Sequence, residues 1–310
     1  MKIGVTGSEG LVGVALCRLL AERGHAVSRF DLRCPSGKGI QGDVLDRDAV
    51  GRLVAGCDGI IHLAAVSRVV WGERDPKLCR RTNVNGTRYV VEAAASGHHP
   101  WVVLASSREV YGEPQALPVT EAAPLQPMNV YGRSKLDAEA LVMGARTRGL
   151  RTVVLRLSNV YGSVVDHHDR VVPAFARAAA EGSELRVDGP GHTFDFTHVD
   201  DTARGIAATV DALASGEHAL PPIHLLTGRP TTLRQLAEWA VAAGDGGSRI
   251  RIAEPRCYDV ARFVGDPARA RSILGWRAER QIEDGIRELV AAFRIADRVS
   301  PGQPALGGVA

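Results

Sequence analysis

Three evenly spaced glycines, directly after the first apolar segment, constrain the fold of this chain more than any other feature. Residues 2–5 are expected to form a buried strand, and an apolar helix is expected to follow through Leu20 and to end at Gly24. The turn between them carries Gly7, Gly10 and Gly13 in a G-x-x-G-x-x-G spacing. In such a turn the glycines allow a tight bend, close approach of phosphate to the backbone, and close packing of helix on strand. Alone the pattern also fits an ordinary glycine turn, but strand, turn and helix in this order predict a site for a dinucleotide pyrophosphate.

Apolar strand-like segments then alternate with helical ones through the first half of the chain. The fourth of these strand segments, 59–65, ends in the small residues Ala64 and Ala65, which leave room for a flat ligand above the sheet edge. The regular alternation predicts an α/β fold with a doubly wound parallel Rossmann sheet. The expected strands are 26–30, a short segment before Gly42, 59–65, 101–105 and 153–157, and the expected helices lie near 47–54 and from Pro76 to just before Gly97.

The second strand ends on Asp31, at about the distance from the glycine turn where an acidic residue binds the adenosine ribose hydroxyls. A carboxylate at this point repels a 2′-phosphate, which favours NAD over NADP as the cofactor. Arg29 and Arg33 lie close by in the sequence and could neutralise such a phosphate, so NADP stays open. Asp31 could also simply cap the turn at the end of its strand.

The second half of the chain is less regular, which predicts a smaller lobe beside the sheet. A strand at 223–226 is expected to return to the main sheet, so this C-terminal substrate-binding lobe is discontinuous in sequence. The expected division is a sheet domain over 1–162 with returning segments about 194–228, a lobe over 163–193 and 229–297, and a flexible Pro-, Gly- and Ala-rich tail over 298–310. Further expected helices are 171–180, 202–213, 233–243 with Thr231 as its cap, 267–274 and 282–296, and further strands are 185–187 and 249–252.

The side chains with the clearest chemical potential are Tyr131 and Lys135. Asn129 is expected to cap a helix here, and a separation of four residues then puts the phenol and the ammonium on one helix face. A free phenol titrates near ~10, so it is a weak base at neutral pH, and a neighbouring cation lowers its pKa. The pair can therefore take a proton from a hydroxyl group. On many surface helices the same spacing is merely a phenol beside a solvated amine.

The fifth strand leads directly into Ser107, Arg108 and Glu109, at the sheet edge where ligands bind in α/β folds. A serine hydroxyl both donates and accepts hydrogen bonds, so Ser107 can relay a proton between a substrate oxygen and Tyr131. If the extended backbone continues past Ser107, Glu109 shares its side, and Arg108 is turned away or bridges to another carboxylate. His62, in the fourth strand, is expected to be a core histidine with a bonded ring.

Composition and charge exclude several classes of function. The 45% hydrophobic and 24% charged content is typical of a soluble globular protein. A net charge of +3 without a long basic run argues against nucleic acid or a membrane surface as a partner. Five scattered cysteines without a C-x-x-C pair indicate reduced thiols, and His167-His168-Asp169 is interpreted as a solvated loop rather than a metal site. No apolar stretch approaches the ~20 residues of a membrane span, and no signal peptide is expected, so we expect a cytoplasmic protein.

Several longer motifs accompany the glycine turn and the Tyr131-x-x-x-Lys135 pair. They are His62-Leu63-Ala64-Ala65, Asn83-Val84-Asn85-Gly86-Thr87, Ser106-Ser107-Arg108-Glu109-Val110-Tyr111-Gly112, Arg156-Leu157-Ser158-Asn159-Val160-Tyr161-Gly162, Asp195-Phe196-Thr197-His198-Val199-Asp200-Asp201 and Leu274-Gly275-Trp276. In this order they resemble the extended short-chain dehydrogenase/reductases, and within them the NAD-dependent nucleotide-sugar epimerase/dehydratase group. The resemblance spans about residues 2 to 290.

The resemblance implies roles for individual residues. Tyr131 would be the base on the sugar 4-hydroxyl, Lys135 would hold the nicotinamide ribose and lower the Tyr131 pKa, and Ser107 would hydrogen-bond O4. The implied cofactor is NAD, and the implied partners are a nucleotide-diphosphate sugar and a second copy of the chain in a homodimer. The implied cofactor-binding residues are Gly7, Gly10, Leu11, Val12, Gly13, Asp31, Asp43, Val44, Leu63, Ala64, Ala65, Asn83, Tyr131, Lys135 and Ser158, and the implied substrate-binding residues are Ser107, Asn159 and Arg256.

The resemblance identifies the family more closely than the reaction. Its members begin by oxidising C4 to a 4-keto sugar, and we expect an NAD-dependent 4-epimerase that then returns the hydride to the other face. Arg108 stands where 4,6-dehydratases carry an acid, and Phe194 stands where an arginine often precedes the Asp-Phe pair. Glu109 keeps open a decarboxylase or a 4,6-dehydratase. A non-catalytic NAD-binding regulatory module is a more remote alternative, since such proteins commonly lose the Tyr-Lys pair.

Overall fold

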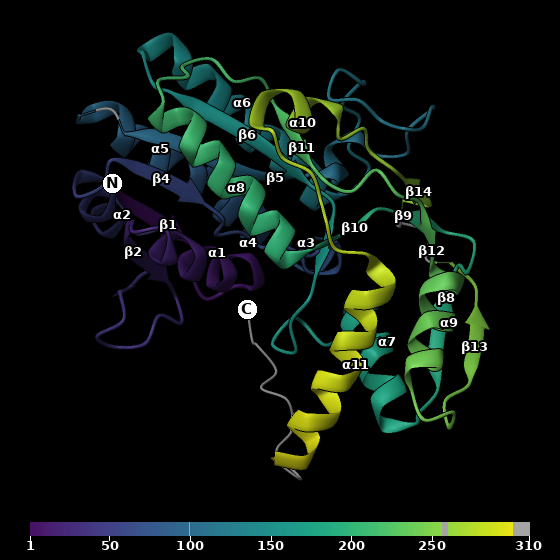
Figure 1. The fold of residues 1–310 in the computed structure, drawn as a ribbon. Helices are drawn as coiled ribbons and strands as arrows, with labels where there is room; N and C mark the ends of the chain where they lie inside the picture. The colour runs from purple at the N-terminus through teal and green to yellow at the C-terminus, as the bar shows by residue number, and fades with distance from the viewer. Residues whose placement is uncertain (99, 256–259, 300–310) are drawn as a thin grey trace.

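The computed structural model describes residues 1–98, 100–255 and 260–299. Its centre is a seven-stranded sheet in which all neighbouring strands are parallel (Figure 1). In spatial order the strands are β11 (Ile223–Leu225), β6 (Thr152–Leu157), β5 (Trp101–Ser107), β4 (Gly59–His62), β1 (Lys2–Thr6), β2 (Ala26–Asp31) and β3 (Ile40–Gln41). The order reverses beside β1, so the predicted doubly wound sheet is confirmed. The strand predicted at 223–226 does return to this sheet.

Successive strand residues point to opposite sides of the sheet, so both of its faces carry apolar side chains. Helices cover both faces. The helices are α1 (Leu11–Glu22) and α8 (Val199–Ala214) on one face, and α2 (Arg47–Ala55), α5 (Thr87–Ser96) and α6 (Val130–Gly144) on the other, with a short 3₁₀ turn (Ala145–Arg148) after α6. Ile61 and Val103 share a core with α1 and α8, whereas Ile60 and Val102 share a second core with α2, α5 and α6. The strands are therefore apolar on both faces, as parallel strands between two helix layers must be.

The long helix predicted to start at Pro76 is interrupted. It consists of α4 (Pro76–Arg80), a π-helical segment (Arg81–Gly86) and α5, and a further helix, α3 (Val69–Arg74), precedes it. Asp75 caps α4 through a hydrogen bond from the Leu78 amide, with Pro76 at the first helical position. The π segment carries Asn83, whose role is described below.

The smaller lobe has its own apolar core, which includes Phe175, Leu236 and Phe293. Its helices are α7 (Val171–Glu181), α9 (Leu233–Ala243) and α11 (Ile282–Val299), and its strands pair as β8 (Leu185–Asp188) with β13 (Ile250–Ala253), and as β12 (Thr231–Thr232) and β14 (Arg262–Phe263) on either side of β9 (Thr193–Phe194). The cap of α9 is Thr232, in a capping box with Gln235, and not Thr231 as predicted.

Two further connections tie the lobe to the sheet. β7 (Asn159–Tyr161) continues from β6 and pairs with β10 (Phe196–His198), and α10 (Ala268–Leu274) and Trp276 pack on the core beside α8.

The predicted domain boundaries stay a prediction. The tail from residue 300 onwards and Arg256 lie outside the described residues. Within the described ranges, no helix combines the length and the apolar character needed to cross a membrane.

Candidate active site

A cleft of about 1130 Å³ lies along the C-terminal edge of the sheet, with the smaller lobe forming its other wall. The ends of β2, β5 and β6 open into it, together with the loops after β1 and β4, and residues of α7 and β8 line the opposite side. This is the edge at which ligands bind in open α/β sheets. The volume exceeds the ~300–1,000 Å³ that usually holds one small ligand, so a cofactor and a substrate fit together.

The glycine turn forms one end of the cleft. Gly7 has a φ of +72°, and a Cβ on Gly13 would lie only 2.1 Å from the Gly7 carbonyl oxygen, so the helix can approach the turn only without that side chain. No side chain caps the N-terminus of α1, which leaves its first amide groups directed at the cleft. Among the predicted cofactor residues, Gly7, Gly10, Leu11, Val12 and Gly13 all line the cleft. This cradle fits the pyrophosphate of a dinucleotide.

Asp31 ends β2 and lines the cleft beside this turn. Its carboxylate accepts hydrogen bonds from the Arg33 and Glu9 amides at 2.9 and 3.1 Å, so it also caps the turn. Arg29 forms an ion pair of 2.8 Å with Glu9, and the Arg33 guanidinium donates to the Glu9 carbonyl at 3.1 Å. Arg29 is therefore paired with the Glu9 carboxylate, whereas the Arg33 side chain is 59% exposed and lies 3.6 Å from the Asp31 carboxylate. The Asp31 carboxylate and the pairing of Arg29 favour a free ribose hydroxyl at this point.

The inner part of the cleft contains most, but not all, of the residues predicted for it. Leu63, Ala64, Ala65, Asp43, Val44 and Ser158 line it. Asn83 is not among the lining residues, because its side chain is 1% exposed and lies behind the cleft wall, and its cofactor-binding role stays a prediction. Its amide exchanges hydrogen bonds of 2.8 and 3.0 Å with the backbone of Val66 and donates to Ser134. Asn83 thus holds the loop after β4 in place.

His62 is a core histidine, as expected. Its ring nitrogens lie 2.7 Å from the Thr6 hydroxyl and 3.0 Å from the Thr87 hydroxyl, and the side chain is 1% exposed. Burial lowers the pKa of His62 to about 3, so the ring is neutral at physiological pH. It supports the β4 strand and takes no part in the cleft.

Tyr131 and Lys135 enter the cleft from the first turns of α6, where Asn129 caps the helix by accepting from the Gly132 amide at 2.7 Å. Lys135 is buried and donates to the Ala105 carbonyl at 2.8 Å, with its ammonium 5.9 Å from the Tyr131 ring centre. Burial lowers the pKa of Lys135 to about 8. Burial also raises the pKa of Tyr131 to about 12, against smaller lowering effects from the Ser107 hydroxyl and Arg170. Desolvation of the phenol outweighs the effects that lower its pKa, so the net shift of the Tyr131 pKa is upward, and the lowering expected from Lys135 stays a prediction.

Ser107, Arg108 and Glu109 line the cleft next to Tyr131. The extended backbone does not continue past Ser107, so the condition for Glu109 to share its side is not met: a 3₁₀ turn (Arg108–Tyr111) begins there, and the Ser107 hydroxyl caps it at the Glu109 amide. Arg108 and Glu109 form an ion pair of 2.9 Å, and Asn129 donates to the second carboxylate oxygen at 2.7 Å.

The Arg108 guanidinium also lies over the ring of Phe194, 4.6 Å from its centre. Phe194 occupies the position where an arginine was expected from the resemblance. The site thus keeps a cation at this point, but the cation comes from Arg108 in the strand-end loop and stacks on the aromatic ring.

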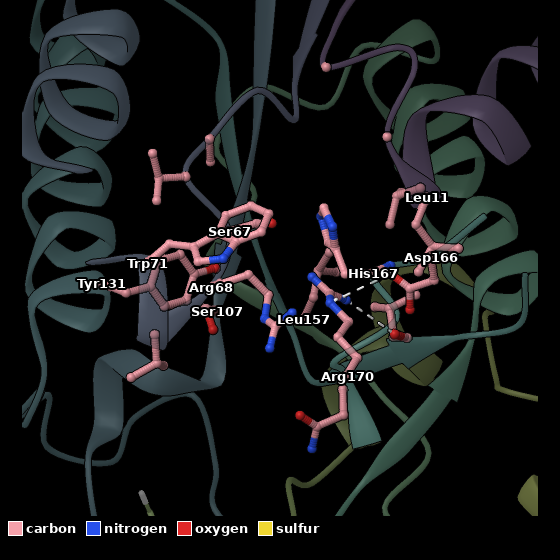
Figure 2. A pocket seen from close by; sticks show the side chains of 18 of the residues that line it. Leu11, Ser67, Arg68, Trp71, Ser107, Tyr131, Leu157, Asp166, His167 and Arg170 are labelled. Atoms are coloured by element: carbon pink, nitrogen blue, oxygen red, sulfur yellow. Dashed lines mark hydrogen bonds and ion pairs between the residues drawn. The ribbon is translucent and has the colours of Figure 1, made fainter. Parts of the chain in front are cut away.

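Two segments that were not predicted to contribute to the site meet over the cleft, one following β4 and one following β7. An ion pair between Arg68 and Asp169 joins them, and the ring of His167 packs edge-on against Trp71 with centres 4.6 Å apart. Figure 2 shows Arg68 and Trp71 on the side of Tyr131, with His167 and Arg170 facing them. The available signal was the cluster of charged residues and histidines at 166–170, in the irregular stretch after Gly162. The interpretation of His167 and Asp169 as merely solvated is corrected by these contacts.

The predicted substrate residues divide into two groups. Asn159 lines the cleft, and its amide donates to the Asp195 carbonyl at 3.4 Å. Arg256 lies outside the described residues. Across the described ranges, no three His, Cys, Asp or Glu side chains are grouped so that they could hold a metal ion.

The chain is similar in sequence and in structure to proteins of known activity. A model of the NAD dependent epimerase/dehydratase family matches residues 3–221. UDP-glucose 4-epimerase of Mycolicibacterium smegmatis is 30% identical, over 95% of this chain and 99% of that protein. dTDP-glucose 4,6-dehydratase of Streptomyces niveus is 29% identical, over 95% and 93%. The crystal structure of UDP-glucose 4-epimerase from Brucella ovis in complex with NAD has a TM-score of 0.87 at 28% identity, covering 94% of this chain and 98% of that one.

Proposed function

Because the chain belongs to the NAD dependent epimerase/dehydratase family, and so to the extended short-chain dehydrogenase/reductases, we propose that it is a nucleotide-sugar 4-epimerase with NAD as its cofactor. Relatives at nearly equal identity carry out epimerisation and dehydration, so the choice between them depends on the residues beside the reacting carbon.

The cofactor would lie along the sheet edge. The glycine turn and the free α1 N-terminus would hold its pyrophosphate, Asp31 its adenosine ribose, and Lys135 and Ser158 the nicotinamide end. Bound NAD would accept the hydride of C4 and later return it. Tyr131 would take the O4 proton as the ketone forms and give it back to O4 on reduction, while Ser107 would hydrogen-bond O4 throughout. Asn159 would face the substrate diphosphate.

The observation that carries the choice of epimerisation is the state of Glu109. Its two carboxylate oxygens are engaged by Arg108 and Asn129, so it is held as a neutralised structural partner. Removal of the C5 proton requires a carboxylate directed at the substrate, whereas Glu109 is held against Arg108 and Asn129, and expulsion of the C6 hydroxyl requires an acid where Arg108 stands. Arg108 cannot supply a proton at physiological pH. A 4-epimerase needs neither group, because the keto sugar only has to rotate before the hydride returns.

The second candidate is a decarboxylase or a 4,6-dehydratase. The observation in its favour is that Glu109 does line the cleft beside Ser107, so substrate binding could release it from Arg108. A regulatory module without catalysis is disfavoured, since Tyr131, Lys135 and Ser107 are all present and all line one cleft.

Product masses distinguish these reactions. The protein is incubated with UDP-glucose, dTDP-glucose and the matching hexuronic acid derivatives, and products are separated and weighed, with Tyr131→Phe as the matched inactive control. An epimerase yields a product of unchanged mass and new retention time. Loss of water or of carbon dioxide in the wild-type reaction would replace the proposal with the second candidate.

A further inference from the structure

Asn129 is buried, with 3% of its surface exposed, and is not among the residues that line the cleft. Its side-chain oxygen caps α6 by accepting from the Gly132 amide at 2.7 Å. Its side-chain NH2 group donates to the Glu109 carboxylate at 2.7 Å, across a sequence separation of 20 residues. One side chain therefore holds the start of α6 and the loop after β5 at the same time.

The partners of the Asn129 amide fix its orientation. The Gly132 amide only donates, so it requires the side-chain oxygen, and the Glu109 carboxylate accepts, so it requires the NH2 group. A helix cap alone needs just an oxygen, which serine, threonine or aspartate also supply. Asp46 shows this simpler arrangement at α2, where it accepts from two amides of its own first turn at 3.0 and 3.1 Å. Asn129 thus makes one contact more than capping requires.

The contacts of Asn129 continue to the Ser107 hydroxyl, which accepts from the Glu109 amide at 3.2 Å. Three successive hydrogen bonds therefore connect this hydroxyl, through Glu109 and Asn129, with the Gly132 amide. Tyr131, which precedes Gly132, lines the cleft together with Ser107, and Figure 2 shows the two on the same side of it. All four side chains are at most 8% exposed, so water competes little for these hydrogen bonds.

The backbone is packed closely at the same point. A Cβ on Gly132 would lie 2.5 Å from the Glu109 carbonyl oxygen, so the helix approaches the loop this closely only without that side chain. The start of α6 therefore has two restraints on its distance from the Ser107 loop, a close backbone contact and the Asn129 hydrogen bonds. Two hydroxyl groups that act on one substrate oxygen need such restraints, because a misplacement of about 1 Å costs about 10²-fold in rate.

We infer that Asn129 is a positioning residue for the proposed reaction, which sets the Tyr131 phenol against the Ser107 hydroxyl by bridging α6 to Glu109. The inference rests on the proposed function, in which both hydroxyl groups act on the O4 oxygen of the sugar. It also gives Glu109 a role without C5 chemistry, since its side chain is the acceptor that completes the bridge. A carboxamide at position 109 offers an acceptor oxygen as well, so the bridge does not depend on the charge of Glu109.

Substitutions at Asn129 separate the bridge from the cap. Asn129→Ser keeps an oxygen for the helix amide but is too short to reach Glu109 at the same time, whereas Asn129→Ala removes both contacts. Each variant is loaded with NAD, and kcat and KM are measured with UDP-glucose, or with whichever sugar of the panel the wild-type protein converts. Both variants are expected to lose about 10–10²-fold in kcat, to the same extent, with KM and NAD content unchanged.

Urea unfolding of the same proteins separates positioning from loss of the fold. Asn129→Ala is expected to unfold at lower urea than Asn129→Ser, because it alone lacks the cap, although the two turn over equally fast. Asp46→Ala removes the cap of α2 outside the cleft lining, so it is the matched control, expected to lose stability and to keep the wild-type kcat. If Asn129→Ala does not fold, the comparison of Asn129→Ser with Asp46→Ala decides the question.

A double-mutant cycle tests whether Asn129 acts through the alignment with Ser107. Ser107→Ala removes the hydroxyl that is to be aligned. Asn129→Ser is therefore expected to cost clearly less in the Ser107→Ala protein than in the wild type.

Three results overturn the inference. A wild-type kcat in Asn129→Ser would leave Asn129 as a helix cap only. A raised KM with unchanged kcat would make the effect one of substrate binding, and fully multiplicative costs in the cycle would show that Asn129 and Ser107 act independently. In each case the wild-type protein still converts its sugar, whereas a wild-type protein that converts none of the panel overturns the proposed function, and this inference with it.

Discussion

Arg108 and Glu109, neighbours in the sequence, form an ion pair of 2.9 Å inside the cleft, beside the Ser107 hydroxyl. Their side chains are only 11% and 8% exposed, and the guanidinium rests on Phe194. Two charges that could each act on a substrate are thus directed at one another. The pair therefore forms a charge-balanced wall of the site.

Glu109→Gln is therefore expected to keep epimerisation per folded molecule near that of the wild type. The same change leaves Arg108 buried without its partner, which costs about 3–5 kcal/mol of stability. Urea unfolding measures this loss, and the double variant Arg108→Met with Glu109→Gln is the control expected to recover most of it. If Glu109→Gln instead blocks product formation while NADH accumulates, chemistry at C5 or C6 occurs. If even the first oxidation, at C4, is lost, Glu109 is neither dispensable for catalysis nor a group that acts only at C5 or C6.

Tyr131→Phe is expected to fold normally, to retain NAD and to lose about 10²–10⁴-fold in turnover, the usual contribution of a positioned acid–base group. Circular dichroism and cofactor content establish that the variant is intact before rates are compared. Near-normal turnover would refute the catalytic assignment as a whole.

Lys135 gives the stability a pH dependence whose sign follows from burial. Its pKa falls from 10.5 to about 8 in the folded protein, so between these values the unfolded chain binds more protons than the folded one. Stability therefore rises with pH across this window and carries a constant penalty below it. Lys135→Met is expected to lack the rise, as measured by urea unfolding at a series of pH values. A variant with the same slope as the wild type would contradict the assigned shift.

The cofactor recovered from denatured protein is expected to be NAD, because it would be reoxidised in every cycle and retained. Mass spectrometry of the released nucleotide checks this, and NADP in its place would count against the assignment. Asp31→Ala is expected to weaken NAD binding and also to loosen the glycine turn, since the carboxylate accepts from the Glu9 amide. Unchanged NAD affinity in this variant would remove Asp31 from the site.

A homodimer is expected from the family, with α5 and α6 meeting the same helices of a second copy in a four-helix interface. Light scattering at micromolar concentration should give twice the chain mass of 33.0 kDa. A monomer mass under these conditions would reject the dimer.

Much of the fold followed from local patterns in the sequence. The strand–glycine–helix unit, the alternation of strands and helices, and the Asn129 cap depend on interactions within a few residues, and each appears where it was predicted. The cleft likewise contains the predicted glycines, Tyr131, Lys135 and Ser107, because the ends of parallel strands share one sheet edge.

Other features were decided only by tertiary structure. The sequence could not show that Asn83 lies behind the cleft wall, that Arg108 pairs with Glu109 in a 3₁₀ turn, or that Arg68 meets Asp169. Nor could the spacing of Tyr131 and Lys135 decide the ionisation of the phenol. Desolvation and charge interactions depend on every group packed around a side chain, and most of those groups are far away in the chain.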